Sequence, residues 1–170
     1  MLYFAYGSNM SSRRLSARIK AKKVCVARLP GYKLAFEKVG KDGSGKCSLK
    51  KILDGKGLVY GVVWEFGLKE KEKLDAFEGL GMGYSEKQVT VFDCLTDRPI
   101  RAYLYDATWL DPHLLPFGWY KVHVLKGALE NGFPREYVKR IISFKAVRDH
   151  NPKRARRELA IYKRPRVDHL

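Results

Sequence analysis

Short strand-like segments separated by turn residues fill most of the first 107 residues, and this pattern constrains the fold more than any other feature. Each segment is rich in β-branched, aromatic or alternating apolar residues. None approaches the roughly 20 apolar residues that a membrane-spanning helix needs, so we expect no membrane association. The segments are LYFAY (2–6), VCVARL (24–29), KLAFEK (33–38), LVYGVVWEF (58–66), QVTVFDCL (88–95) and IRAYLYDA (100–107).

Turn residues predict how some of these segments pair. Pro30-Gly31 favours a turn between two antiparallel strands, and TDRP (96–99) favours a second hairpin. Helical patterns interrupt the strands in four places: after Gly7, over 67–79, over 122–129 and from Pro134 onward.

The pattern as a whole predicts an α+β fold. We expect a small mixed or antiparallel barrel-like sheet with helices packed outside it, spanning residues 1–148. Residues 149–170 form a basic C-terminal tail with little apolar pattern, which we expect to be extended or mobile.

The net charge of +16 is concentrated at the two ends of the chain. Residues 12–51 carry a net charge of +11, residues 52–139 carry −2, and residues 140–170 carry +7. This distribution predicts weak contact between the tail and an anionic partner, and the alternative is a solvated basic surface. The tail's candidate cations are Lys153, Arg154, Arg156 and Arg157.

Several chemistries lack their motifs. The sequence has no GxSxG elbow, no GxxxxGK[ST] phosphate loop and no HExxH zinc helix. His113 and His123 lie ten residues apart without carboxylate or cysteine partners at ligand spacing, so we expect no metal and no cofactor. The three cysteines are widely spaced, and the opening MLYFAYGSN does not read as a signal peptide. Both features predict reduced thiols in the cytoplasm, and we expect all three cysteines to be packed within strands.

The first candidate site is the junction that follows the opening strand. Gly7 ends the strand, and Ser8 or Asn9 is a candidate N-cap for the helix that follows. Unpaired N–H groups at such a junction can hold a carboxylate or phosphate, and a glycine lets the ligand approach the backbone. The alternative is a strand–turn–helix junction with no ligand.

The second candidate is Glu78, at the end of the helix predicted over 67–79. Gly79 is its expected C-cap, and Leu74 and Phe77 are apolar neighbours. A helix C-terminus and apolar surroundings both disfavour a carboxylate charge, as general acid/base work near neutral pH requires. The alternative is a surface glutamate beside a helix cap.

Together these segments resemble the γ-glutamylcyclotransferase family over most of residues 1–140. YFAYGSN (3–9) is similar to the family's substrate loop, and DAFEG (75–79) with Tyr84 is similar to the segment holding its catalytic glutamate. GVVWEF (61–66) and YKVHVLKGALENGFP (120–134) resemble later parts of that fold.

The resemblance implies an enzyme that cyclises the γ-glutamyl group of a small γ-glutamyl compound to 5-oxoproline, releasing an amino acid or an amine. It implies a monomer or homodimer that needs no cofactor and no metal. γ-Glutamyl amino acids, glutathione and γ-glutamylamines are all candidate substrates. Glu78 would be the acid/base, and the substrate would be bound by Tyr3, Phe4, Ala5, Tyr6, Gly7, Ser8, Asn9, Tyr84 and Tyr120.

Two alternatives remain beside this hypothesis. One is a catalytically silent domain of the same fold that binds a small ligand. The other is a nucleic-acid-binding protein that uses the basic ends of the chain.

Overall fold

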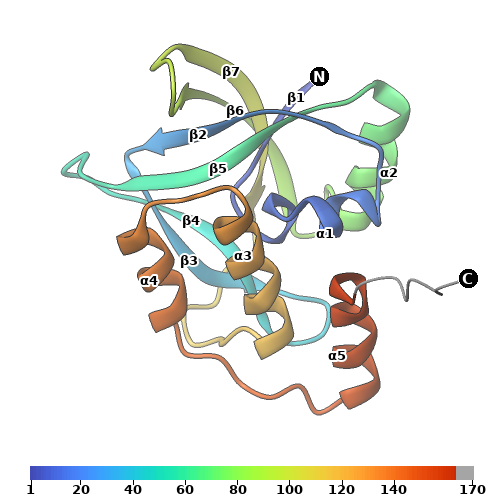
Figure 1. Ribbon diagram of the computed structural model, residues 1–170. Helices are drawn as coiled ribbons and strands as arrows, with labels where there is room; N and C mark the ends of the chain where they lie inside the picture. The colour runs from blue at the N-terminus through green and yellow to red at the C-terminus, as the bar shows by residue number, and fades with distance from the viewer. Residues whose placement is uncertain (164–170) are drawn as a thin grey trace, which may run out of the picture.

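Five strands close into a barrel in the computed structural model, which describes residues 1–163 (Figure 1). Neighbouring strands run antiparallel except at the closure, where β1 and β7 meet in parallel at Tyr3 and Tyr103. The expected α+β fold with a barrel-like sheet and outer helices is confirmed. In spatial order the strands are β1 (Leu2–Ala5), β5 (Leu58–Glu65), β2 (Lys22–Pro30), β6 (Tyr84–Asp93) and β7 (Pro99–Ala107).

The two remaining strands form a separate hairpin beside the barrel. β3 (Tyr32–Val39) pairs with β4 (Gly45–Lys51), and neither belongs to the barrel sheet. A turn with Gly31 in the left-handed region does connect β2 to β3, but the predicted pairing of these two strands is wrong. The two edges of β2 are already occupied by β5 and β6. The predicted hairpin around TDRP is confirmed as β6–β7.

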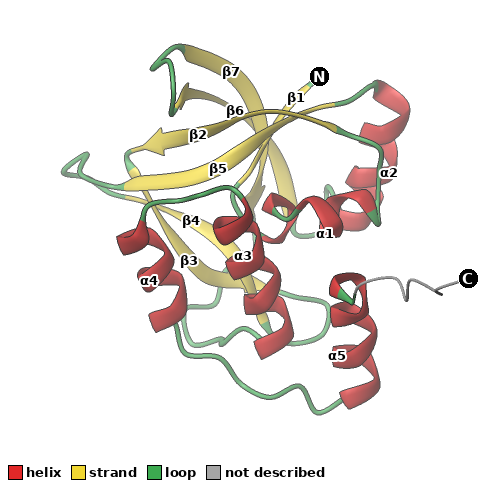
Figure 2. Cartoon of the chain, viewed as in Figure 1, coloured by secondary structure: helices red, strands yellow, loops and turns green. Residues whose placement is uncertain are grey.

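The helices lie outside the sheets, as Figure 2 shows. No described helix is both long enough and apolar enough to cross a membrane. The predicted helix over 122–129 starts earlier, at Gly118, and it therefore includes Trp119 and Tyr120. The helices are η1 (Ser8–Met10), α1 (Ser12–Ser16), α2 (Leu68–Glu78), α3 (Gly118–Glu130), α4 (Arg135–Ser143), α5 (Pro152–Leu159) and η2 (Ala160–Tyr162).

The segment after Gly7 differs from the expected capped helix. It forms the single 3₁₀ turn η1, and the α-helical turn starts only at Ser12. Neither Ser8 nor Asn9 caps a helix through its side chain. Met10, Leu15 and Ile19 nevertheless face the core, being at most 3% exposed. The turn is therefore held in place by its buried residues.

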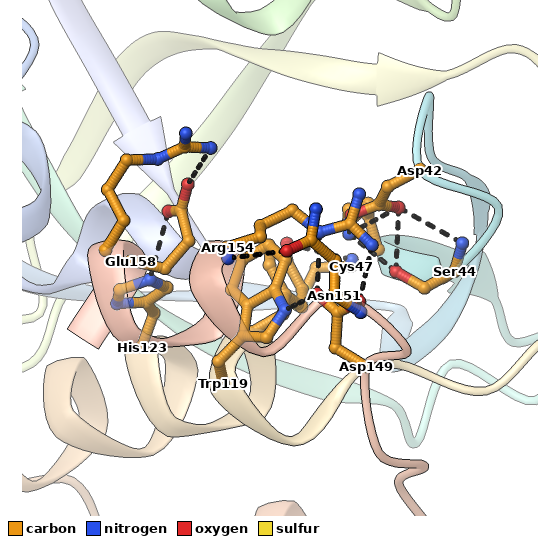
Figure 3. A network of polar contacts seen from close by, with 12 residues as sticks. Asp42, Ser44, Cys47, Trp119, His123, Asp149, Asn151, Arg154 and Glu158 are labelled. Atoms are coloured by element: carbon orange, nitrogen blue, oxygen red, sulfur yellow. Dashed lines mark hydrogen bonds and ion pairs between the residues drawn. The ribbon is translucent and has the colours of Figure 1, made fainter.

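The basic tail is not extended over the part that the structure describes. Asn151 caps α5 by accepting a hydrogen bond from the Arg154 N–H (3.0 Å), and Pro152 occupies the first turn. Asp149 accepts hydrogen bonds from the Arg154 guanidinium (2.6 Å) and from the Trp119 indole (2.8 Å), which join the tail to α3 (Figure 3). The sequence pattern missed these contacts because they are polar. Residues 164–170 of the predicted tail lie outside the described residues.

Candidate functional site

A narrow cavity opens where the first strand ends, between the barrel and the β3–β4 hairpin. Its volume is about 20 Å³, and it opens outward into a second cavity of about 190 Å³ that shares Ser8, Glu78, Tyr84 and Tyr120 with it. We call these two spaces the inner and the outer cavity. The inner cavity is lined by Tyr3, Tyr6, Gly7, Ser8, Asn9, Cys47, Glu78, Tyr84, Tyr105 and Tyr120.

Glu78 reaches the inner cavity because α2 ends at that residue. Gly79 adopts a left-handed conformation (φ 73°), and its N–H donates to the Asp75 carbonyl (2.8 Å), which closes the helix. Leu74, one turn earlier, is fully buried and fixes this end of α2 against the core. The predicted cap and the predicted position of Glu78 on the last turn are confirmed.

Polar partners surround Glu78, in contrast to the apolar surroundings that we expected. Its Oε1 accepts hydrogen bonds from Asn9 Nδ2 (2.9 Å) and from Arg18 Nη1 (2.6 Å). Phe77 is 56% exposed, so it does not cover the carboxylate. Among the described residues nothing donates to Glu78 Oε2. One oxygen is thus fixed by two donors, and the other is available for a proton transfer.

The turn after β1 presents unpaired backbone donors to the same cavity. Its first hydrogen bond runs from Met10 N–H to the Gly7 carbonyl (3.0 Å). The N–H groups of Gly7, Ser8 and Asn9 have no acceptor within residues 1–163. Because η1 is a single 3₁₀ turn, these three N–H groups can bind an anion without the dipole of a longer helix.

Gly7 is required by packing as well as by ligand approach. A Cβ added at Gly7 would lie 2.9 Å from Cys47 Cβ and 3.5 Å from Tyr120 Oη. The absence of a side chain therefore lets the turn lie directly on β4 and α3.

Tyrosine hydroxyls form the rest of the inner wall and are held by backbone groups. Tyr6 Oη donates to the Tyr105 carbonyl (2.6 Å), and Tyr120 Oη accepts from the Cys47 N–H (3.1 Å). Tyr84 Oη donates to the Cys47 carbonyl (3.3 Å). Burial raises the pKa of each of these three tyrosines well above its usual value. They are therefore neutral hydroxyls at physiological pH.

Cys47 lies among these tyrosines as a protonated thiol. Burial raises its pKa to about 12, so a thiolate nucleophile is not available at neutral pH. Of the other two cysteines, Cys25 is half-buried in β2, and Cys94 is exposed beyond the end of β6. The prediction that all three are packed within strands is wrong for Cys94.

The outer cavity carries an excess of positive charge. Two of its cations are paired with its own carboxylates: Arg18 with Glu78 (2.6 Å) and Lys46 with Asp42 (2.8 Å). Arg14 is paired with Glu158 of α5. Lys38 and Lys41 also line this cavity, and neither forms an ion pair with any residue that the structure describes. Within residues 1–163 no group of three or more His, Cys, Asp or Glu side chains could hold a metal ion.

The structure brings eight of the ten predicted site residues together around the inner cavity. Phe4 and Ala5 are the exceptions, since both are fully buried in the core and neither lines a cavity. Asn9, predicted to contact substrate, donates to Glu78. Sequence reasoning missed Arg18, Lys38 and Tyr105. The sequence did contain a signal for Lys38, because it follows Leu34 and Phe36 at a spacing of two residues and so shares their buried face of β3.

Both the sequence and the fold of this protein are similar to those of known proteins. Residues 58–141 match the AIG2-like family. The chain is 35% identical to the gamma-glutamylcyclotransferase of Bos taurus, over 84% of this chain and 77% of that protein. It is also 35% identical to the Homo sapiens protein of the same name, over 82% and 76% of the two chains. Its fold is similar to a solved gamma-glutamyl cyclotransferase structure, with a TM-score of 0.80, 29% identity, and 88% and 90% of the two chains covered.

Proposed function

The chain belongs to the γ-glutamylcyclotransferase family, and we propose that it cyclises the γ-glutamyl group of a small γ-glutamyl compound to 5-oxoproline. The reaction is intramolecular: the α-amine attacks the γ-carbonyl of the same molecule, the γ-amide bond breaks, and an amino acid or amine leaves. Both reacting atoms arrive in one substrate, so the protein has to fold that substrate and move protons. Orientation of this kind can supply about 7–11 kcal/mol in favourable intramolecular reactions.

The observation that carries this proposal is that Glu78 is the single carboxylate among the described residues that line the inner cavity. Burial keeps the neighbouring tyrosine hydroxyls and the Cys47 thiol protonated, because it raises the pKa of each. Glu78 is therefore the group in this cavity that can accept a proton at neutral pH. Its free Oε2 would take a proton from the α-ammonium of the substrate and return it to the departing nitrogen.

The turn after β1 would hold the other end of the γ-glutamyl group. The unpaired N–H groups of Gly7, Ser8 and Asn9 suit either the substrate α-carboxylate or the oxyanion that develops on the γ-carbonyl. Asn9 and Arg18 would act through Glu78, because both hold its Oε1. Tyr84 and Tyr120 would border the bound substrate, as the family resemblance implies.

Release of 5-oxoproline from a panel of γ-glutamyl compounds tests this proposal. The panel contains γ-glutamyl amino acids, glutathione and γ-glutamylamines, and chromatography measures 5-oxoproline at several enzyme concentrations. We expect release from at least one compound at a rate proportional to enzyme. Binding of these compounds without any 5-oxoproline would instead identify a silent binding domain.

We also propose a cellular compartment and an anionic partner for this protein. Three free cysteines support the cytoplasm as the compartment of this protein. The anionic partner proposed for the tail is supported by the exposed side chains of Lys153, Arg156 and Arg157 on α5. Arg154, the fourth predicted cation, is bound to Asp149 instead.

A further inference from the structure

Lys38 is a largely buried lysine of the outer cavity that forms no ion pair with the residues the structure describes. The residue is only 7% exposed, and it lies on β3 facing the loop that follows Glu78. A Cβ added at Gly83 would be 3.2 Å from both Cε and Nζ of this lysine. Within the part of the chain that the structure describes, Lys38 Nζ donates no hydrogen bond and forms no ion pair.

Lys46 shows how a satisfied lysine is held in the same cavity. Its Nζ donates to Asp42 Oδ2 (2.8 Å) and to Ser44 Oγ (2.6 Å). Lys38 has only the face of the Tyr84 ring, 4.6 Å from Nζ. A ring face attracts the charge but leaves the three N–H donors of the ammonium unfilled.

The Lys38 ammonium borders the outer cavity, so a ligand in that cavity can supply the acceptors that the described residues do not. Burial lowers the pKa of Lys38, and the Glu78 and Asp42 carboxylates offset this lowering only in part. Neither Glu78 nor Asp42 lies within ion-pair distance of Lys38 Nζ, and each is paired with another cation. Arg18 occupies Oε1 of Glu78, Lys46 occupies Asp42, and Lys41 adds a second unpaired cation.

We propose that Lys38 is a specificity-determining residue of this site, whose ammonium binds a carboxylate on the leaving portion of the substrate. The assignment rests on the proposed function and deepens it. Glu78 lines both cavities, so a substrate whose α-carboxylate end enters the narrow inner cavity places its leaving portion in the outer cavity, which Lys38 also lines. The substrate class is then γ-glutamyl amino acids or peptides, whose leaving portions are anionic, in preference to γ-glutamylamines.

A matched pair of substrates isolates the carboxylate that Lys38 would bind. γ-Glutamyl-alanine and γ-glutamyl-alaninamide have nearly the same shape, but only the first has a leaving group with a carboxylate. We expect the wild-type protein to favour the acid over the amide by about 10- to 100-fold in kcat/KM, as for a hydrogen bond to a charged group. Lys38→Met should abolish most of this preference by slowing the acid and sparing the amide.

The control is Lys33→Met, which removes an exposed lysine from the same strand. We expect this variant to keep the wild-type preference. Equal turnover of acid and amide by the wild-type protein overturns the assignment without any variant, and so does a preference that survives in Lys38→Met. In both cases 5-oxoproline still forms and the proposed function stands. If the wild-type protein releases 5-oxoproline from no γ-glutamyl compound, the proposed function fails and the assignment to Lys38 fails with it.

Discussion

Gly7 lies in the turn after β1 (residues 7–9, called the substrate turn below), where this turn touches the β3–β4 hairpin. A glycine is needed there because of its contact with Cys47. We predict that Gly7→Ala destabilises the protein, because the new Cβ would lie 2.9 Å from Cys47 Cβ. Overpacking of this kind typically costs about 1–3 kcal/mol, and the turn must move if β4 does not. Thermal unfolding should show a lower Tm, and 5-oxoproline release should fall.

A second substitution separates packing from ligand approach. Cys47→Gly removes both atoms that the new Cβ meets first, so Gly7→Ala should cost less stability in that background than in the wild-type protein. Strictly additive losses in Tm would contradict the packing explanation. Recovery of stability without recovery of activity would show that the substrate also needs the space at Gly7.

At the scale of elements, α5 is attached to the rest of the protein through a buried carboxylate. Asp149 is 5% exposed, and the Arg154 guanidinium holds its pKa well below the usual range, with backbone and Trp119 donors assisting. A carboxyl whose pKa is lower in the folded state stabilises the protein above its unfolded pKa, near 3.9. That contribution is lost as the pH falls further, through the pKa of the folded state.

We therefore predict that Arg154→Met lowers Tm at neutral pH and that the difference from wild type shrinks in acid. The matched control is Arg157→Met, because Arg157 is exposed on the same helix and lies no closer than 4.0 Å to a carboxylate. Thermal unfolding at a series of pH values from 7 to 2 measures both variants. A pH-independent loss for Arg154→Met would show that its ion pair with Asp149 is not the cause.

Elements with a local signal could be predicted from the sequence, and elements held by distant partners could not. The alternation of β7, the hairpin before it and the glycine-capped end of α2 are all encoded within a few residues. The pairing of β3 with β4 depends on which strand edges are already occupied. Arg18 reaches Glu78 across 60 residues, and no spacing rule connects the two.

At the scale of the whole molecule, the protein has a net charge of +16, and part of this charge lies on α5 as a group of solvent-exposed cations. We predict that replacing Lys153, Arg156 and Arg157 together by Gln weakens retention on a heparin column and leaves 5-oxoproline release unchanged. The reason is that all three side chains are exposed and none lines the inner or outer cavity. Arg154 is kept, so that α5 remains attached. Elution of the triple variant at the wild-type salt concentration would contradict the proposed anionic partner.

We propose that Glu78 moves the protons of the lactam-forming reaction, and the Glu78→Gln variant is the decisive test of this role. Glutamine preserves the shape of the side chain but cannot accept and return a proton. Glu72→Gln, on an exposed position of α2, is the matched control. The measurement is 5-oxoproline release, with calorimetric binding of the same γ-glutamyl substrate to each variant.

Loss of general acid–base assistance should lower kcat of Glu78→Gln by about 10²–10⁴-fold. Its substrate Kd should stay within a few-fold of wild type, because the N–H groups of the substrate turn are untouched. Glu72→Gln should match the wild-type protein in both measurements. A Glu78→Gln protein that forms 5-oxoproline at the wild-type rate would contradict the claim, and an equal loss of binding and rate would make Glu78 a binding residue instead.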